Sequence, residues 1–130
     1  MPDIPVLATQ IAVLFLSLSI HESAHAYAAW RFGDPTAKLL GRITLNPIKH
    51  IDLFGTVLLP LVLILAKSPV VFGWAKPVPV NTLNFRNRLH DTAWVSIAGP
   101  LSNLALMVAG FILLKIFVRL ATCRRTIPWW

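Results

Sequence analysis

The residues best suited to chemistry lie close together in the first apolar segment, in the pattern His21-Glu22-Ser23-Ala24-His25. On an α-helix, about 100° per residue places both imidazoles and the carboxylate within one arc, with the histidines about 6 Å apart along the axis. Such a pair can bind one Zn²⁺ while the carboxylate takes a proton from an activated water. We therefore predict that His21 and His25 are zinc ligands and that Glu22 is a general base.

The surroundings of Glu22 strengthen this prediction. It is the only glutamate of the chain and lies in an apolar segment, where an uncompensated ionisable group costs about 3 kcal/mol or more. The structural alternative is a pair of histidines at the membrane interface beside a glutamate that extends toward water. A chain of this composition contains the pattern by chance about once in a thousand shuffles. The metal site is the favoured interpretation.

The composition places these residues in a membrane protein. Apolar residues make up 56% of the 130 residues and charged residues 13%, against about 45–50% and about 25% in average soluble domains. The 12 Lys and Arg outnumber the 5 Asp and Glu and give a net charge of +7. This excess indicates attraction to anionic membrane lipids and not to nucleic acid, because the chain lacks the polar face that nucleic-acid binding needs. We predict one membrane-embedded domain over residues 1–130.

Three apolar segments are expected to form the helices that position the site, over about 4–30, 53–72 and 92–121. The apolar run of the second is about 21 Å long, too short for a hydrocarbon core of about 30 Å. Gly99-Pro100 predicts a kink or an unwound turn inside the third segment. The expected fold is an all-α integral membrane protein with about three transmembrane or re-entrant helices and short extended, β-like loop segments.

Two connections are expected to be extended. Between Thr36 and Asn46, apolar and polar residues alternate around Gly41, which predicts a short hairpin or strand. From Phe72 to Val80, the two prolines hold the residues before them out of the helical region and predict an extended segment.

Basic residues indicate the orientation of the chain. The first loop, residues 31–49, is rich in Lys and Arg and is expected on the cytoplasmic side of the cell membrane. His25 lies about 9 Å of helix from Arg31, so the site is expected inside the membrane, nearer the cytoplasmic face. The second loop is also basic. Both loops can be cytoplasmic if the second apolar segment re-enters without crossing.

The chain resembles the site-2 protease family of intramembrane zinc metalloproteases, in its short form without a PDZ domain. The resemblance covers roughly residues 5–115. It rests on four ordered segments, which are HESAHA at 21–26, NPIKHIDLFG at 46–55, FGWAKPVPV at 72–80 and AGPLSN at 98–103. It implies a multi-pass endopeptidase that uses Zn²⁺ to cleave transmembrane protein or peptide substrates, with the same zinc ligands and the same catalytic glutamate.

The resemblance also implies residues that bind the substrate. Asn103 is expected near the site, where it bonds the substrate or the oxyanion. The extended residues Lys76, Pro77 and Val78 are expected to pair with an unwound substrate segment by strand addition, which supplies backbone hydrogen bonds.

The third zinc ligand is the point at which the chain departs from the family pattern. The family supplies an aspartate from an Asp-Gly motif on a later helix, and this chain has no Asp-Gly and no acidic residue after Asp91. We therefore expect either a C-terminally truncated form or a substitute ligand. Asp52 is the candidate substitute, although an aspartate before an apolar run more often caps the helix that follows.

Three functions are compatible with these residues. The first is an active intramembrane protease. The second is a truncated, catalytically silent relative that acts as a membrane binding or scaffold protein. The third is a small basic membrane protein that uses the histidines for metal transport or sensing. The glutamate between the histidines favours the first, because metal storage has no use for a base there, and the missing ligand favours the second.

Overall fold

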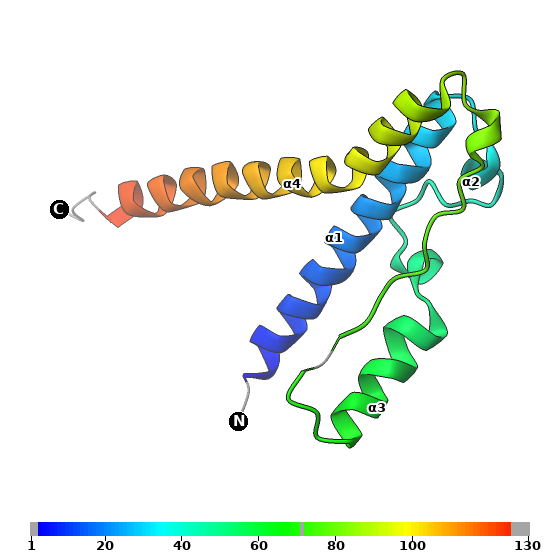
Figure 1. Cartoon of the computed structure of the whole chain (residues 1–130). Coiled ribbons are helices and arrows are strands. Elements are labelled where there is room, and N and C mark those ends of the chain that lie inside the picture. The colour runs from blue at the N-terminus through cyan, green and yellow to red at the C-terminus, as the bar shows by residue number, and fades with distance from the viewer. Residues whose placement is uncertain (1–2, 71, 126–130) are drawn as a thin grey trace.

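The computed structural model describes residues 3–70 and 72–125, and within them it consists of helices and irregular segments without a strand. Two long helices, α1 (Ile4–Arg31) and α4 (Arg88–Arg125), meet at one end of the molecule, where the loops gather (Figure 1). Both helices are long and apolar enough to cross a membrane. The predicted all-α membrane fold is confirmed.

Helix α1 forms where the apolar run predicts it. Pro5 stands in its first turn, where the missing N–H leaves no hydrogen bond unmade. The helix ends because Gly33 adopts a φ of 112° and the N–H of Asp34 donates to the carbonyl of Ala29 at 2.9 Å. The polar loop end of the molecule begins at this turn.

The second apolar segment is shorter than the predicted helix over 53–72. It consists of a π-helical turn, η2 (Leu53–Leu58), followed by α3 (Leu59–Leu65). The helix ends because Lys67 adopts a left-handed φ of 52° and Pro69 follows it. At 1.5 Å per residue the segment is about 20 Å long, short of a hydrocarbon core of about 30 Å.

After α3 the chain returns to the loop end. Figure 1 shows residues 72–80 running back past α3 as an irregular segment that ends beside the start of α4. Two 3₁₀ turns, η1 (Pro47–His50) and η3 (Thr82–Asn84), lie before and after this excursion. The segment therefore leaves and rejoins the molecule at the same end.

Helix α4 is longer than the predicted range of 92–121 and contains Pro100. Figure 1 shows α4 bending in its yellow part, near residue 100. Proline removes one backbone hydrogen bond and crowds the preceding turn, which bends a helix without ending it. The predicted kink is confirmed, in a helix that stays continuous.

The predicted hairpin or strand around Gly41 is wrong. Residues Thr36–Leu39 form a short helix, α2, which ends where Gly41 adopts a φ of 66°. The N–H of Arg42 donates to the carbonyl of Ala37 at 2.9 Å and closes the turn. The buried side chains of this stretch are those of Ala37 and Arg42, which lie five residues apart and so do not follow the period of two that a strand requires.

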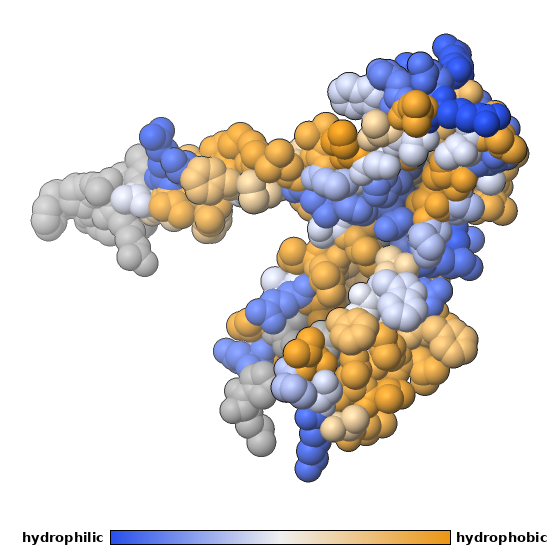
Figure 2. Space-filling view, in the orientation of Figure 1, coloured by the Kyte–Doolittle hydropathy of each residue, from blue (hydrophilic) through white to orange (hydrophobic). Residues whose placement is uncertain are grey.

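The core of the molecule is small and lies where α1 and α4 cross. Ala29, Phe85 and Val95 form its buried cluster. Outside this region apolar side chains are exposed, and Figure 2 shows them covering α3 and the outer length of α4, while hydrophilic residues gather at the loop end. Such a surface suits lipid as the surrounding solvent.

Candidate metal centre

His21 and His25 face each other on one side of α1. Their Nε2 atoms are 3.1 Å apart and their rings meet edge to face. Two nitrogens on one tetrahedral Zn²⁺, each at about 2.0–2.1 Å, are about 3.3 Å apart. The spacing on the helix has therefore brought the two predicted ligands to the separation that a shared metal ion needs.

The other ring nitrogen of each histidine is held by α4. Nδ1 of His25 lies 2.6 Å from the carbonyl oxygen of Val95, so Nδ1 carries the proton and donates it. In the neutral ring this leaves a lone pair on Nε2, directed toward His21. Metal-binding histidines are commonly fixed in this way by a carbonyl behind the ring.

Asn103 performs the corresponding role for His21. Its side-chain amide lies 3.2 Å from Nδ1 of His21, and the hydroxyl of Ser17 donates to its Oδ1 at 3.1 Å. The amide of Asn103 can present either its NH₂ donor or its oxygen acceptor to His21, and the hydroxyl of Ser17 can accept from or donate to the other end of the amide. Asn103 and Ser17 can therefore stabilise either tautomer of His21. If the proton is on Nε2, His21 donates it to His25. If the proton is on Nδ1, the Nε2 atoms of His21 and His25 each keep a lone pair for a metal ion. The expected proximity of Asn103 to the site is present, and its contact is with a histidine.

Gly99 leaves open the space in which a metal ion would lie. A Cβ built on Gly99 would overlap Nε2 of His25 and would lie 2.6 Å from Nε2 of His21. The α-carbon of α4 thus approaches the histidine pair with no side chain between them. The residues fit a metal ion at this point, and any other residue at position 99 would fill it.

Glu22 borders a cavity of about 320 Å³ beside the histidines. Glu22 and His25 of α1 line it together with Pro77, Val78 and Val80 of the extended segment. The remaining lining comes from η3 and the first turns of α4. The predicted base, one predicted ligand and part of the predicted substrate segment thus share one cavity, which is where a peptide bond could reach the carboxylate.

The extended segment that lines this cavity is anchored at its beginning. The N–H of Trp74 donates to the carbonyl of Gly55 at 3.1 Å, and the N–H of Lys76 donates to the carbonyl of His50 at 2.9 Å. Beyond Lys76, the N–H groups of Val78 and Val80 have no hydrogen-bond acceptor within the part of the chain that the structure describes. They leave an open edge beside the cavity.

The end of this segment is fixed by Asp34, which sequence reasoning did not single out. The carboxylate is fully buried and accepts hydrogen bonds from the N–H of Asn81 at 2.7 Å and from the amide of Asn84 at 2.8 Å. It also accepts from the N–H and the hydroxyl of Thr36. Burial raises the pKa of Asp34, but these hydrogen bonds together lower it by more, so the pKa lies below its ordinary value.

Ser23, inside the histidine pattern, joins α1 to the first loop. Its hydroxyl donates to the carbonyl of Thr44 and accepts from the N–H of Thr44 at 3.2 Å. The same carbonyl lies 2.9 Å from Nε2 of His50, which is fully buried. The NPIKHID segment is therefore built onto α1 through Thr44, a residue that no spacing argument indicated.

Asp52 acts as a helix cap in this structure. Its Oδ1 accepts hydrogen bonds from the N–H of Phe54 at 3.0 Å and of Gly55 at 2.7 Å, at the start of η2. No group of three His, Cys, Asp or Glu side chains that could hold a metal ion occurs among residues 3–70 and 72–125. The described residues bring together two predicted ligands, and Asp52 is not joined to them.

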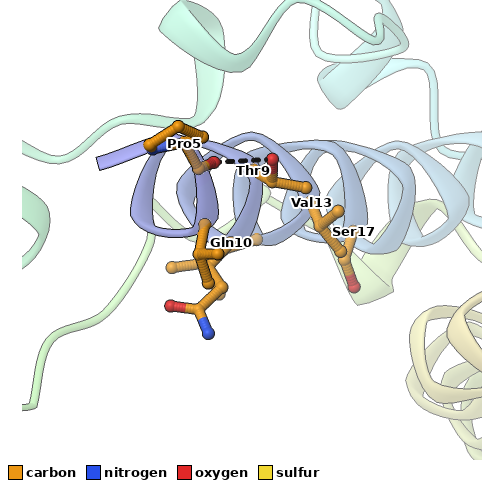
Figure 3. Close-up of a pocket in the computed structure, with 7 residues that line it drawn as sticks. Pro5, Thr9, Gln10, Val13 and Ser17 are labelled. Atoms are coloured by element: carbon orange, nitrogen blue, oxygen red, sulfur yellow. Dashed lines mark hydrogen bonds between the residues drawn. The ribbon is translucent and has the colours of Figure 1, made fainter. Parts of the chain in front are cut away.

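A larger cavity lies away from this chemistry. It is an open groove of about 660 Å³ along the N-terminal half of α1, lined by Pro5, Thr9, Gln10, Val13 and Ser17 together with apolar neighbours (Figure 3). The hydroxyl of Thr9 is satisfied within the helix by the carbonyl of Pro5. The groove contains no metal-ligating residue, so we place the candidate centre at the smaller cavity beside Glu22.

Comparison with known proteins gives relatives for most of the chain. It is 52% identical over 104 residues to the protein named "Putative zinc metalloprotease YwhC" of Bacillus subtilis, covering 80% of this chain and 44% of the relative. It is 39% identical over 99 residues to "Putative zinc metalloprotease Rip2" of Mycolicibacterium smegmatis, and 38% identical over 96 residues to the protein of the same name in Mycobacterium tuberculosis.

These matches cover 75% and 74% of this chain and 36% of each Rip2 protein, so the chain spans less than half the length of these relatives. No protein-family model matches the chain. No solved structure matches it either.

Proposed function

We propose that this chain forms the catalytic metal-binding part of a zinc metalloprotease that hydrolyses peptide bonds of membrane-embedded segments. The observation that supports this most directly is the pair of Nε2 atoms 3.1 Å apart, with Gly99 leaving the space between them open and Glu22 on the adjoining cavity. The names of the relatives support a zinc-dependent protease.

Each residue of the centre has a role in such a reaction. A Zn²⁺ ion bound there would supply Lewis acidity, which would lower the pKa of a water molecule and polarise a peptide carbonyl. His21 and His25 supply two of the three protein ligands usual for catalytic zinc. Glu22 accepts a proton from the attacking water and returns it to the leaving amine. Asn103 and the carbonyl of Val95 keep the imidazoles oriented.

We further propose that the substrate pairs with the open edge of residues 77–80. The N–H groups of Val78 and Val80 lie on alternate residues, so they point to the same side of an extended backbone. A substrate helix that unwinds beside them would regain two hydrogen bonds through strand addition. Its peptide bonds would then cross the cavity that Glu22 and His25 border.

The same elements support a proposal for the position of the centre in the membrane. Both long helices are apolar, and the loop end that follows Arg31 is basic. We propose that this end lies at the cytoplasmic face, that the excursion through α3 is re-entrant, and that cleavage occurs inside the membrane near that face.

The test measures zinc and cleavage separately in the full chain, purified in detergent and reconstituted with a transmembrane substrate. The double variant His21→Ala/His25→Ala should lose zinc, whereas His90→Ala, which changes an exposed histidine near the start of α4, should keep it. Glu22→Gln should keep zinc and lose about 10²–10⁴ in rate.

The outcomes separate the parts of the proposal. Zinc at wild-type stoichiometry in the double histidine variant would rule out the metal centre. Zinc binding by the wild type without cleavage of a reconstituted transmembrane substrate would rule out proteolysis by this chain on its own. Unchanged cleavage by Glu22→Gln would leave the carboxylate with a structural role alone.

A further inference from the structure

A third cavity, of about 550 Å³, is lined by Lys76, Pro77 and Pro79 of the extended segment and takes no part in the proposed reaction. Its charged lining is entirely basic and comes from three parts of the chain, namely Arg42 after α2, Lys49 in η1 and Lys76 in the extended segment. No acidic residue lines it. Three cations around one hollow repel each other, so the arrangement favours a bound anion.

The three cations differ in how firmly they are held. Arg42 is 8% exposed, and its guanidinium donates to the carbonyl of Lys49. Lys49 and Lys76 have exposed side chains, and the backbone beneath Lys76 is fixed by its hydrogen bond to His50. The cavity therefore offers one buried, hydrogen-bonded guanidinium and two exposed ammonium groups.

The rest of the lining is apolar. Leu40, Ile48 and Ile51 line the same cavity, and Ile48 is 72% exposed. The chain reaches this point after the C-terminal end of α1, the level at which a membrane-spanning helix meets lipid headgroups. A small inorganic anion would leave these apolar side chains uncovered, whereas a phospholipid presents a phosphodiester next to its glycerol and acyl chains.

We propose that this cavity binds the headgroup of an anionic phospholipid. The phosphodiester lies between Arg42, Lys49 and Lys76, and the glycerol and upper acyl carbons lie against Leu40 and Ile48. Basic pockets at the cytoplasmic side of membrane proteins are known to bind such headgroups. This proposal does not depend on proteolytic activity, because none of its three cations belongs to the metal centre.

The test titrates the full chain in non-ionic detergent with short-chain phosphatidylglycerol and measures the heat of binding by calorimetry. Short-chain phosphatidylcholine, inorganic phosphate and an acidic peptide are titrated in parallel. Phosphatidylglycerol is expected to bind most tightly. The double variant Lys49→Gln/Lys76→Gln should weaken it about 25-fold, at about fivefold for each cation removed near the surface.

The matched control is Lys67→Gln/Lys115→Gln, which removes the same charge from residues outside the cavity and should bind like the wild type. Circular dichroism and thermal melting of both double variants establish that they fold. Equal weakening in both variants would overturn the site, because the effect would come from net charge. Equal affinity for phosphatidylcholine, or tighter binding of phosphate or of the acidic peptide, would overturn the assignment to an anionic phospholipid.

Discussion

The two halves of α4 belong to one long helix and have opposite relations to the rest of the molecule. In the first half, Val95 is 6% exposed, Gly99 approaches the histidine pair, and Asn103 contacts His21. In the second half, side chains such as Phe117 are exposed, and a Cβ on Gly110 would meet nothing within 4 Å. In Figure 1, α4 bends in its yellow part, between the end that lies beside α1 and the outer length that extends away from it.

The difference shows that the two halves of one helix place different requirements on their residues. In a membrane-like setting, an exposed segment needs only to be apolar and helical, because lipid accepts any such surface. A segment that packs against another element also needs particular shapes and hydrogen bonds. Function is therefore expected to be sensitive to substitution at the loop-side half of α4 and its partners, and tolerant along the outer half.

The strongest contrast is expected between two glycines of α4. Gly99→Ala should reduce zinc binding by the full chain below detection, because the added methyl group occupies the space between the Nε2 atoms. Gly110→Ala adds the same methyl group to open space and should leave zinc binding unchanged. It should raise the free energy of unfolding by up to about 1 kcal/mol. Metal analysis and thermal melting measure both. Full zinc occupancy in Gly99→Ala would place the metal elsewhere.

The second contrast lies between two aspartates at the ends of α1. Asp34→Asn should destabilise the protein by about 2–3 kcal/mol, because an amide cannot accept the hydrogen bonds that reach both carboxylate oxygens. Asp3→Asn is the control, since Asp3 makes no side-chain cap hydrogen bond, and it should shift the melting temperature little.

Asp34 also gives the loop end a pH dependence with a definite sign. Its pKa is lower in the folded protein than in the unfolded chain, so its stabilisation is complete above the unfolded pKa of about 3.9. It is lost as the pH falls through the lower, folded pKa. Thermal melting between neutral and acidic pH should show a smaller acid-induced loss in Asp34→Asn than in the wild type. An identical pH profile in the two proteins would contradict the buried, hydrogen-bonded carboxylate.

The third contrast concerns Asn103. Asn103→Ala should weaken zinc binding by about 10–100-fold, since it removes the group behind a metal-binding imidazole. Asn103→Asp should restore much of the loss, because a carboxylate accepts from Nδ1 of His21 and leaves Nε2 free. Met107→Ala, one turn farther along α4 and exposed, serves as the control. Equal zinc affinity in the alanine and aspartate variants would show that Asn103 acts through packing.

The smallest effect is expected at Ser23. Ser23→Ala leaves the N–H of Thr44 without its hydroxyl acceptor and should lower the free energy of unfolding by about 1 kcal/mol. Thr9→Ala removes a hydroxyl that bonds only within α1 and should change it by less than about 0.5 kcal/mol. Chemical denaturation in mixed micelles compares the two. If Thr9→Ala lowered the free energy of unfolding more than Ser23→Ala, the loop end would not be the part of the molecule that is more sensitive to substitution.

The sequence predicts those features that depend on local periodicity. The apolar runs predict α1 and α4, and the i, i+4 spacing predicts that His21 and His25 share a face. The approach of Gly99 to their rings depends on how two helices cross, and more than seventy residues of the chain separate Gly99 from His25. Nothing in either helix alone contains that information, although the small residue next to Pro100 is compatible with a close approach.

Local patterns also failed where backbone geometry overrides them. Alternating apolar residues predicted a strand near Gly41. Residues 3–70 and 72–125 contain no strand with which it could pair. The stretch forms the short helix α2 instead, and Gly41 ends it in a left-handed conformation. The helix expected over 53–72 ended at Leu65, because the turn at Lys67 reverses the chain. The role of Asp34 could not be predicted from its neighbours in the sequence, because it accepts hydrogen bonds from Asn81 and Asn84, which lie far along the chain.

Pro77 lines both the cavity beside Glu22 and the basic cavity around Arg42. A single extended stretch of backbone is therefore a wall shared by two binding volumes. An occupant that displaces this wall alters both volumes, and thermodynamic linkage makes the effect reciprocal: each occupant changes the affinity of the other by the same factor. The composition of the surrounding bilayer would then act as an allosteric variable for whatever binds beside the histidines.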